Sequence, residues 1–384
     1  MTRFLHGVLE SDKRYEVDVI SLATSMSDEA SVLFRRPSTW AHGPRAICRQ
    51  WDGLEYLHVG AVGAEFEVQR YRHRKQLRSI LQKYDFLFFA TGMPSWAATA
   101  QGVGVPFGMW VASTVRDDRM SRLQAETRWK RWAKTAITSF VESAERQALR
   151  GSEFVLTISE YTKGLLRTFE TQKEPIVAPC GVDTDLFVPC RGAKPGYLLS
   201  VGRFSDPRKN GRMLLEAYRI LRRCCNDTPD LLLVGSPPED EVMEQVRQWG
   251  IREHVIVAGP KRGKDLAELY RNAGCFALSS DQEGLAIVVI EAMASGLPVV
   301  CTRCGGPEML VQDGVTGFLS SVGDAESFAR NLQTVVTRSK LREQFGFTAR
   351  RIAEQQYSLS MAGKPFLAVM HEHFFARGLV GQSN

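Results

Sequence analysis

Two cations follow a predicted buried strand in the second half of the chain. Arg203 comes directly after the apolar run 197–201 and a glycine, and Lys209 follows after a turn at Asp206-Pro207. The carboxyl ends of parallel strands form the ligand-binding edge of such a sheet, so we expect both side chains to reach a ligand. Two fixed cations neutralise a diphosphate, and each charge-assisted hydrogen bond contributes about 1.5–3 kcal/mol. Taken alone, the pair has an alternative interpretation: an ordinary surface arginine and lysine that bind no ligand.

Two glutamates flank the start of a helix that we expect to begin near Leu285. Helix starts present unpaired N–H groups and a positive dipole end, so they bind anions, and Gly284 lets a ligand approach this backbone closely. Glu283 lies just before the helix, and Glu291 lies about a turn and a half inside it, behind any phosphate held there. A carboxylate repels phosphate but accepts hydrogen bonds from a pair of sugar hydroxyls. The apolar neighbours of Glu291 disfavour a solvated surface glutamate.

Short apolar strands alternate with helical stretches along almost the whole chain, a pattern typical of parallel α/β architecture. In the first half we expect strands at residues 17–23, 54–59, 84–90, 107–112, 154–158 and 175–178. In the second half we expect them at 197–201, 230–234, 255–258, 275–279, 298–301 and 317–319. A closing helix is expected at 359–375.

A chain of 384 residues is long enough for two domains. The turn-rich segment 179–189, bounded by prolines, separates the two halves. We therefore expect an acceptor-binding domain over 1–180, a nucleotide-sugar-binding domain over 181–358, and a helical segment over 359–384 long enough to cross back to the first domain. Two doubly wound, Rossmann-like domains facing each other across a cleft would bind ligands at the carboxyl ends of their strands.

The composition excludes several classes of protein. Apolar residues make up 44% of the chain and charged residues 24%, ordinary values for a soluble globular protein. No apolar run approaches the roughly 18 residues needed to span a bilayer, and the charged first twenty residues exclude a signal-peptide core. Eight scattered cysteines indicate reduced thiols in the cytoplasm. No convincing cluster of metal ligands is present, and Asp183 and Asp185 are better explained as turn residues.

Positive charge is concentrated in one part of the chain. Residues 70–150 carry 15 lysines and arginines against 6 aspartates and glutamates. Two solvated helix faces are one explanation. A surface that binds anionic lipid or an anionic acceptor is the other, and Trp129 and Trp132 beside the charges favour it. No nucleic-acid-binding motif accompanies the charge, so no nucleic-acid partner is expected.

Several motifs together resemble the retaining glycosyltransferases of family 4, which have the GT-B fold. Residues 181–189 resemble the junction motif of that family, and 201–210 its diphosphate-binding pair. Glu283 to Glu291 matches the family's E-x7-E signature, and residues 305–308 and 313–319 follow as they do in the family. The resemblance covers most of the chain.

The resemblance implies roles for the residues above. Arg203 and Lys209 would hold the donor diphosphate, Glu283 would lie by the donor sugar, and Glu291 would hold the ribose. The base would stack near Gly259–Arg262, contacted mainly through backbone, and the backbone of four consecutive residues would support the phosphates: Gly284, Leu285, Ala286 and Ile287. The leaving nucleoside diphosphate would then be stabilised by side-chain cations and a helix start, with no metal required.

The chain departs from the family pattern at three places. Residues 4–13 resemble the helix after the family's first strand and glycine-rich loop, which leads to the hypothesis that this strand lies upstream of Met1 or is absent. Ser113 and Thr114 occupy the position where the family often has a histidine; their hydroxyls bind sugars but do not titrate near neutral pH. Ala286 stands where glycine is commoner.

The sequence thus predicts a hexosyltransferase-type enzyme (EC 2.4) acting in polysaccharide or glycolipid biosynthesis. It would use a UDP- or GDP-linked sugar and a sugar or lipid-linked acceptor, in the cytoplasm or peripherally at the inner face of the membrane. A non-catalytic binding or scaffold protein and a sugar-nucleotide 2-epimerase are the alternatives.

Overall fold

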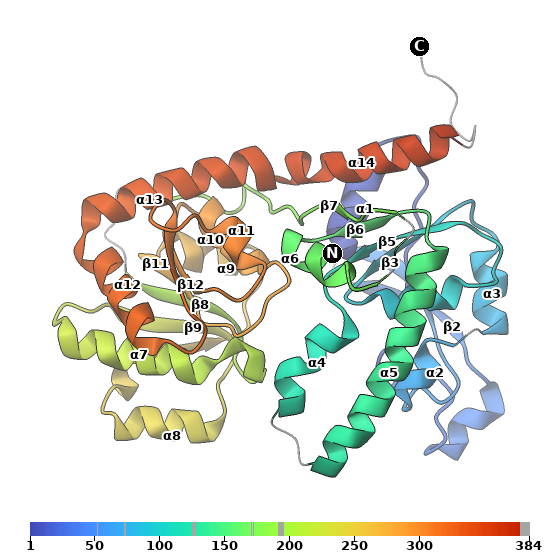
Figure 1. The fold of residues 1–384 in the computed structure, drawn as a ribbon, viewed down its shortest axis with the longest axis horizontal. Coiled ribbons are helices and arrows are strands. Elements are labelled where there is room, and N and C mark those ends of the chain that lie inside the picture. Colours follow the sequence, from blue (N-terminus) through green and yellow to red (C-terminus); the bar gives the residue numbers. More distant parts are fainter. Residues whose placement is uncertain are drawn as a thin grey trace. The chain divides into compact units, whose positions relative to one another are not determined.

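The structure is a computed structural model and describes residues 1–51, 53–72, 74–124, 128–169, 171, 173–190 and 196–376. Within these ranges, the side chains of residues 120–133 and 375–376 are not described. The chain forms two compact units (Figure 1). Unit 1 holds residues 1–158, 162–178 and the C-terminal helix from Pro365, and unit 2 holds Ser159–Tyr161 and Pro179–Lys364.

Unit 2 is built on one six-stranded, fully parallel sheet in the order β10-β9-β8-β11-β12-β13. Its strands are β8 (Tyr197–Arg203), β9 (Asp230–Ser236), β10 (Val255–Gly259), β11 (Cys275–Leu278), β12 (Val299–Thr302) and β13 (Gly317–Ser320). All six lie where the sequence predicts strands. Parallel strands covered by helices read as continuous apolar runs, which makes them easy to recognise.

The helices of unit 2 connect these strands. They are α7 (Gly211–Cys224), α8 (Asp240–Gln248), α9 (Gly263–Arg271), α10 (Ile287–Ala294), α11 (Pro307–Leu310), α12 (Ala325–Thr337) and α13 (Ser339–Ile352), with the short turns η3 (Pro207–Lys209), η4 (Arg252–His254) and η5 (Ala353–Tyr357). One hydrophobic core lies between the sheet and helices α7 and α12, and it includes Tyr218 and Phe328. Arg350 on α13 donates hydrogen bonds to the carbonyls of Thr184, Phe187 and Ala294, which fixes the segment after the domain junction.

Unit 1 contains two sheets instead of the single doubly wound sheet expected for residues 1–180. One has the order β1-β3-β2 and the other β4-β5-β6-β7. Among the described strands, β1 pairs only with β3, and β4 pairs only with β5, so no strand joins the two sheets. The bounds are β1 (Ile20–Leu22), β2 (Ala46–Trp51), β3 (Leu54–Val59), β4 (Leu87–Thr91), β5 (Phe107–Val111), β6 (Val155–Thr157) and β7 (Ile176–Val177).

Strand β2 is the element that the sequence analysis missed. It pairs antiparallel with β3, from Ala46 opposite Val59 to Trp51 opposite Leu54. Its sequence Ala46-Ile47-Cys48-Arg49-Gln50-Trp51 has polar residues before its last position, and Cys48, Gln50 and Trp51 are exposed. An edge strand of this kind lacks the apolar run that marks buried parallel strands.

The helices of unit 1 are α1 (Thr2–Glu10), α2 (Glu67–Arg70), α3 (Lys75–Leu81), α4 (Val115–Gln124), α5 (Arg128–Gly151) and α6 (Glu160–Leu166), with the 3₁₀ turns η1 (Pro37–His42) and η2 (Pro94–Ala100). The closing helix α14 (Leu359–Ala376) begins in unit 2 and belongs to unit 1 from Pro365 on (Figure 1). There Phe366 packs against Phe4 of α1 and Trp110 of β5, with ring centroids 5.6 and 4.6 Å away. In the part of the chain that the structure describes, no helix has the length and apolar character needed to span a bilayer.

Candidate active site

The predicted site residues of unit 2 gather where the strand order of its sheet reverses. From β8 the chain proceeds to β9 and β10 on one side, and it then returns to place β11 on the other side of β8. The crevice outside the carboxyl ends of β8 and β11 is therefore the switch point at which open α/β sheets bind ligands. Arg203 ends β8, and the segment Ser279–Glu283 follows β11.

Lys209 and Glu283 are in direct contact at this switch point. The Lys209 ammonium forms an ion pair with Glu283 Oε1, and the Ser280 hydroxyl donates to the same oxygen over 2.7 Å. The stem of Lys209 lies against Gly202, where a Cβ would be 3.7 Å from Lys209 Cδ. Both charged side chains are mostly buried, so each neutralises the other and neither is a solvated surface group.

Arg203 is placed differently. Its guanidinium lies 3.6 Å from Asp206 Oδ2, and 71% of its side chain is exposed. The structure therefore brings Lys209 and Glu283 together and leaves Arg203 at the edge of the site, with a long side chain able to reach a ligand.

The turn that carries Lys209 is tied to the segment after β11. Asn210 has a left-handed backbone (φ 44°), caps α7 by accepting from the Met213 N–H, and donates to Asp281 Oδ1 over 2.7 Å. The Ser279 hydroxyl donates to the carbonyl of Lys209 over 3.0 Å. These bonds hold the cation and the loop before α10 in one rigid arrangement.

The start of α10 differs slightly from the expectation. The helix begins at Ile287 and not near Leu285, because Ala286 adopts a left-handed conformation (φ 63°) that helical residues do not have. The amides of the first turn of a helix have no partner within it. In α10 the amides available to a ligand therefore begin at Ile287. Leu285 and Ala286 are buried in the preceding loop.

Two glycines keep this loop in place. Residues 304–306 cross directly behind residues 283–285, and a Cβ on Gly306 would lie 2.2 Å from the Gly284 carbonyl oxygen. Gly305 has φ 102° and forms an isolated parallel β-bridge with Glu283. The Glu283 N–H donates to the Cys304 carbonyl, and its carbonyl accepts from the Gly306 N–H, both over 2.8 Å. Side chains at these glycines would displace Glu283.

Glu291 lies on α10 with one oxygen engaged. The Tyr270 hydroxyl of α9 donates to Glu291 Oε2 over 2.9 Å. Burial raises the pKa of Glu291 to about 7, and the bond from Tyr270 partly opposes that rise. The sequence analysis missed Tyr270, because its distance from Glu291 along the chain follows no helical or strand spacing. Gly259 ends β10 with φ 68°, and Arg262 is an exposed residue before α9; the structure shows no bond between them and Glu291.

In unit 1, the hydroxyls expected near the reacting sugar support a helix start. Ser113 Oγ donates to Asp117 Oδ2 over 2.8 Å, and Thr114 Oγ1 accepts from the Asp117 N–H over 3.3 Å. Buried Glu145 of α5 accepts from the Val115 N–H over 2.9 Å, and burial raises the pKa of Glu145 to about 8.

Asp183 has the turn role expected of it. Its Oδ1 accepts from the backbone N–H groups of Asp185 and Leu186, each over 3.0 Å. Among the described residues, no group of three or more His, Cys, Asp or Glu side chains is placed to hold a metal ion.

Comparison with known proteins adds a family to this geometry. The family described as "Glycosyl transferases group 1" matches residues 185–352, a range that includes every site residue of unit 2 named above. The MMP alpha-(1->4)-mannosyltransferase of Mycolicibacterium hassiacum is 27% identical over 277 residues, 72% of this chain and 67% of that protein. A sulfoquinovosyl transferase of Arabidopsis thaliana is 33% identical over 184 residues, 46% of this chain but only 36% of that longer protein.

Solved structures share the architecture. A sucrose-phosphate synthase from Thermosynechococcus elongatus has a TM-score of 0.76 at 19% identity, covering 98% of this chain and 93% of that one. HepE from Anabaena, solved with UDP and glucose, has a TM-score of 0.65 at 18% identity, covering 77% and 80% of the two chains. These likenesses confirm the predicted fold class. Residues 185–352 match the glycosyl transferases of group 1, and the chain has the GT-B fold.

Proposed function

We propose that this protein is a retaining glycosyltransferase that moves a sugar from a nucleotide sugar to an acceptor hydroxyl, in polysaccharide or glycolipid assembly. The observation that carries the proposal is the ion pair of Lys209 with Glu283 beside the start of α10, at the switch point of the second sheet. The named activities of the relatives, a mannosyltransferase and a sulfoquinovosyl transferase, support sugar transfer over epimerisation or a scaffold role.

In the proposed reaction, the bond between the anomeric carbon and the diphosphate oxygen breaks, and negative charge grows on the leaving diphosphate. Lys209, Arg203 and the first amides of α10 are the groups that would stabilise this charge. The diphosphate would take over part of the Lys209 contact, since it is a stronger partner for an ammonium than one carboxylate. That exchange would release Glu283 to accept hydrogen bonds from the donor sugar.

Glu291 would bind the ribose through its second oxygen. Tyr270 occupies Oε2, and the side chain is only partly covered. A carboxylate oxygen in this position suits the hydroxyls of a ribose and not the phosphates, which it would repel. The base of UDP or GDP would lie toward Gly259–Arg262, and HepE, which binds UDP and glucose, supports a sugar nucleotide as ligand.

No metal is needed in this proposal, because side-chain cations neutralise the diphosphate. Full activity in excess chelator would support it, and loss of activity restored by a divalent cation would contradict it. The acceptor would be a sugar or lipid-linked hydroxyl at the cytoplasmic face of a membrane.

The test is incubation with UDP- and GDP-linked sugars while free nucleoside diphosphate is measured. Release that depends on an acceptor supports transfer. Interconversion of the sugar nucleotide without release indicates a 2-epimerase, and binding without turnover indicates a scaffold; either result would contradict the proposed function.

A further inference from the structure

A basic hollow lies at the carboxyl end of β3 in unit 1, and none of its lining residues is one of the donor-site residues named above. It has a volume of about 610 Å³. Its walls include three cations, two glutamines and a glycine backbone: Arg72, Arg74, Lys75, Gln69, Gln76 and Gly60. None of the described residues that line it is acidic. The hollow therefore has the charge of a site for an oxyanion, and carboxyl ends of strands are where such folds bind ligands.

Arg74 is fixed in this hollow by backbone carbonyls. Its guanidinium donates to the Gly60 carbonyl over 3.0 Å and to the Arg70 carbonyl over 2.7 Å. Burial lowers the pKa of Arg74 to about 10, so the side chain stays charged near neutral pH. Arg74 Nε and Gln76 Oε1 are buried without a hydrogen-bond partner in the described part of the chain. Such atoms are uncommon and indicate a missing ligand or water.

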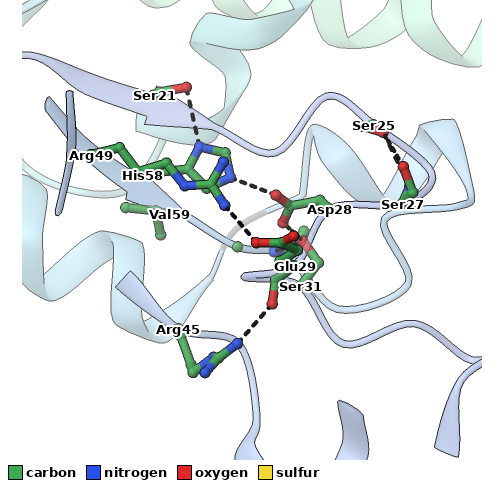
Figure 2. Close-up of polar contacts among 12 residues, drawn as sticks. Ser21, Ser25, Ser27, Asp28, Glu29, Ser31, Arg45, Arg49, His58 and Val59 are labelled. Carbon is green, nitrogen blue, oxygen red and sulfur yellow. Dashed lines mark hydrogen bonds and ion pairs between the residues drawn. The ribbon is translucent and has the colours of Figure 1, made fainter. Parts of the chain in front are cut away.

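A polar network surrounds His58 of β3 (Figure 2), two residues before Gly60 of the hollow. His58 Nε2 lies 2.6 Å from Asp28 Oδ1, and its Nδ1 lies 3.2 Å from Ser21 Oγ. Because both ring nitrogens are engaged, His58 ties the loop after β1 to β3. At Gly60 the loop passes so close that a Cβ would lie 2.0 Å from the Ala30 carbonyl oxygen. The hollow is thus part of a rigid frame.

An apolar shelf borders the basic hollow. It consists of four exposed side chains, with 47–55% of each accessible: Phe34, Trp40, Val62 and Phe66. The Phe34 and Phe66 rings lie 6.0 Å apart, and Trp40 donates to the Leu33 carbonyl beside Phe34. Val62 belongs to both surfaces, and Gly63 lies between the Phe34 ring and the Gln69 stem. Exposed aromatic side chains gathered in one place mark an interaction surface.

We propose that the basic hollow and the apolar shelf together bind the headgroup phosphate and the interfacial region of an anionic membrane lipid. Arg72, Arg74 and Lys75 would hold the phosphate, and the shelf would insert at the level of the glycerol and upper acyl chains. Aromatic side chains beside cations favour this interfacial position. If the protein is the glycosyltransferase proposed above, this surface would hold it on the membrane that carries its acceptor.

This assignment differs from the broad basic surface that the sequence indicates. Arg70 donates to the Ala64 carbonyl, Arg116 pairs with Glu142 and Arg119 with Glu67, so these cations serve the fold. The side chains of Trp129 and Trp132 lie outside the described residues. Arg72 and Lys75 are the exposed cations in the lining of the hollow, and Arg35 and Arg36, which follow Phe34 of the shelf in the chain, are exposed as well.

The test is flotation of the full chain with phosphatidylcholine vesicles, with and without phosphatidylglycerol, at low and high salt and without any sugar nucleotide. We expect binding only to the anionic vesicles, weakened by salt. Replacing the two exposed cations that line the hollow, Arg72→Gln with Lys75→Gln, should weaken binding roughly tenfold to thirtyfold, since each cation near such a surface contributes about one kcal/mol. Phe34→Ser with Phe66→Ser should weaken it roughly tenfold.

Matched controls keep the result specific. Arg78→Gln removes an exposed cation of the same helix α3, and Phe347→Ser removes a side chain that is 74% exposed in unit 2. Both should bind within about twofold of the original protein, and all variants should keep its melting temperature. Equal binding to neutral vesicles, or unchanged binding by both paired variants, would overturn the proposal. So would stabilisation by inorganic phosphate or glycerol phosphate without vesicle binding, which would indicate a soluble ligand.

The vesicle experiment also separates this proposal from the proposed function. It requires no turnover, so vesicle binding by a chain that releases no nucleoside diphosphate would leave the lipid site standing and remove the transferase. Turnover without vesicle binding would leave the transferase standing and remove the lipid site.

Discussion

The hydroxyl of Tyr270 directs its single proton between two acceptors, Glu291 Oε2 at 2.9 Å and the Val288 carbonyl oxygen at 3.1 Å. Tyr270 is fully buried between α9 and the sheet, so this hydroxyl has a fixed position. The bond stabilises the carboxylate of Glu291 against the burial that raises its pKa to about 7. An ionised carboxylate is a stronger hydrogen-bond acceptor for ribose hydroxyls than a protonated carboxyl group, which makes Tyr270 a positioning residue for nucleotide binding.

Replacing Tyr270 by Phe should therefore move the pH dependence of nucleotide binding. Without the hydroxyl, the pKa of Glu291 rises further, so the nucleotide affinity is lost at a higher pH as the solution is acidified. Calorimetric titration of UDP and GDP between about pH 6 and pH 9 measures the midpoint. Cys180 lies near Glu291, but burial raises the pKa of Cys180 to about 11, outside this range.

Tyr218→Phe is the control for this experiment. Tyr218 is equally buried in unit 2, and its one hydroxyl proton is shared between the carbonyls of Pro229 and His254, far along the chain from Glu291. The Tyr218→Phe variant should have a lower free energy of unfolding but the same pH midpoint of nucleotide binding as the original protein. An identical midpoint in Tyr270→Phe and the original protein would remove the assigned role of Tyr270.

Gly306→Ala should damage the site through the backbone. The added Cβ would meet the Gly284 carbonyl oxygen at 2.2 Å, so the loop that carries Glu283 must move. We expect a loss of about 1–3 kcal/mol in the free energy of unfolding together with weaker nucleotide binding. Thermal unfolding with and without nucleotide measures both. Unchanged stability would show that the two loops are not in close contact.

Ala286→Gly should have the opposite effect on stability. Ala286 has φ 63°, a conformation that costs an L-residue about 1–2 kcal/mol and glycine almost nothing. The greater freedom of glycine in the unfolded chain offsets roughly 0.5–1 kcal/mol of this gain. Denaturant titration should show equal or higher stability, by up to about 1.5 kcal/mol. A clear loss would contradict the left-handed assignment.

Glu145→Gln should raise stability at neutral and alkaline pH. The pKa of Glu145 is about 8 in the folded chain against a model-compound value of 4.5, so the folded state holds more protons than the unfolded state between these values. Stability contributed by this site therefore falls as the pH rises through that range. The variant should gain on the order of 4 kcal/mol near pH 8 and nothing near pH 4. Glu326→Gln, an exposed exchange on α12, is the control; a pH-independent difference for Glu145→Gln would contradict the prediction.

The second unit was largely predictable from the sequence, and the first was less so. Strands such as β11 and β12 are fully buried runs of apolar residues, and the residues that follow them carry the chemistry. In unit 1, apolar and polar residues alternate only weakly along β2. The local sequence also does not indicate that β1 and β4 belong to different sheets. Pairing of that kind depends on contacts between distant segments, which periodicity does not report.

The charged residues show the same limit. The spacing of Arg203, Lys209, Glu283 and Glu291 indicated a shared site, but the ion pair of Lys209 with Glu283 and the bond from Tyr270 depend on tertiary structure. The arginines of the first half looked alike in the sequence. In the structure Arg74 is anchored on Gly60, Arg116 pairs with Glu142, and Arg72 is exposed.

The most direct measurement compares UDP and UMP, and GDP and GMP, by calorimetry on the original protein and on Lys209→Gln and Arg203→Gln. If these cations hold the second phosphate, each variant loses roughly tenfold to a hundredfold in diphosphate affinity, at about 1.5–3 kcal/mol per bond, and much less in monophosphate affinity. Arg212→Gln, an exposed cation on α7, should leave both affinities unchanged. Equal losses for the diphosphate and the monophosphate, or no loss in either variant, would contradict the diphosphate site.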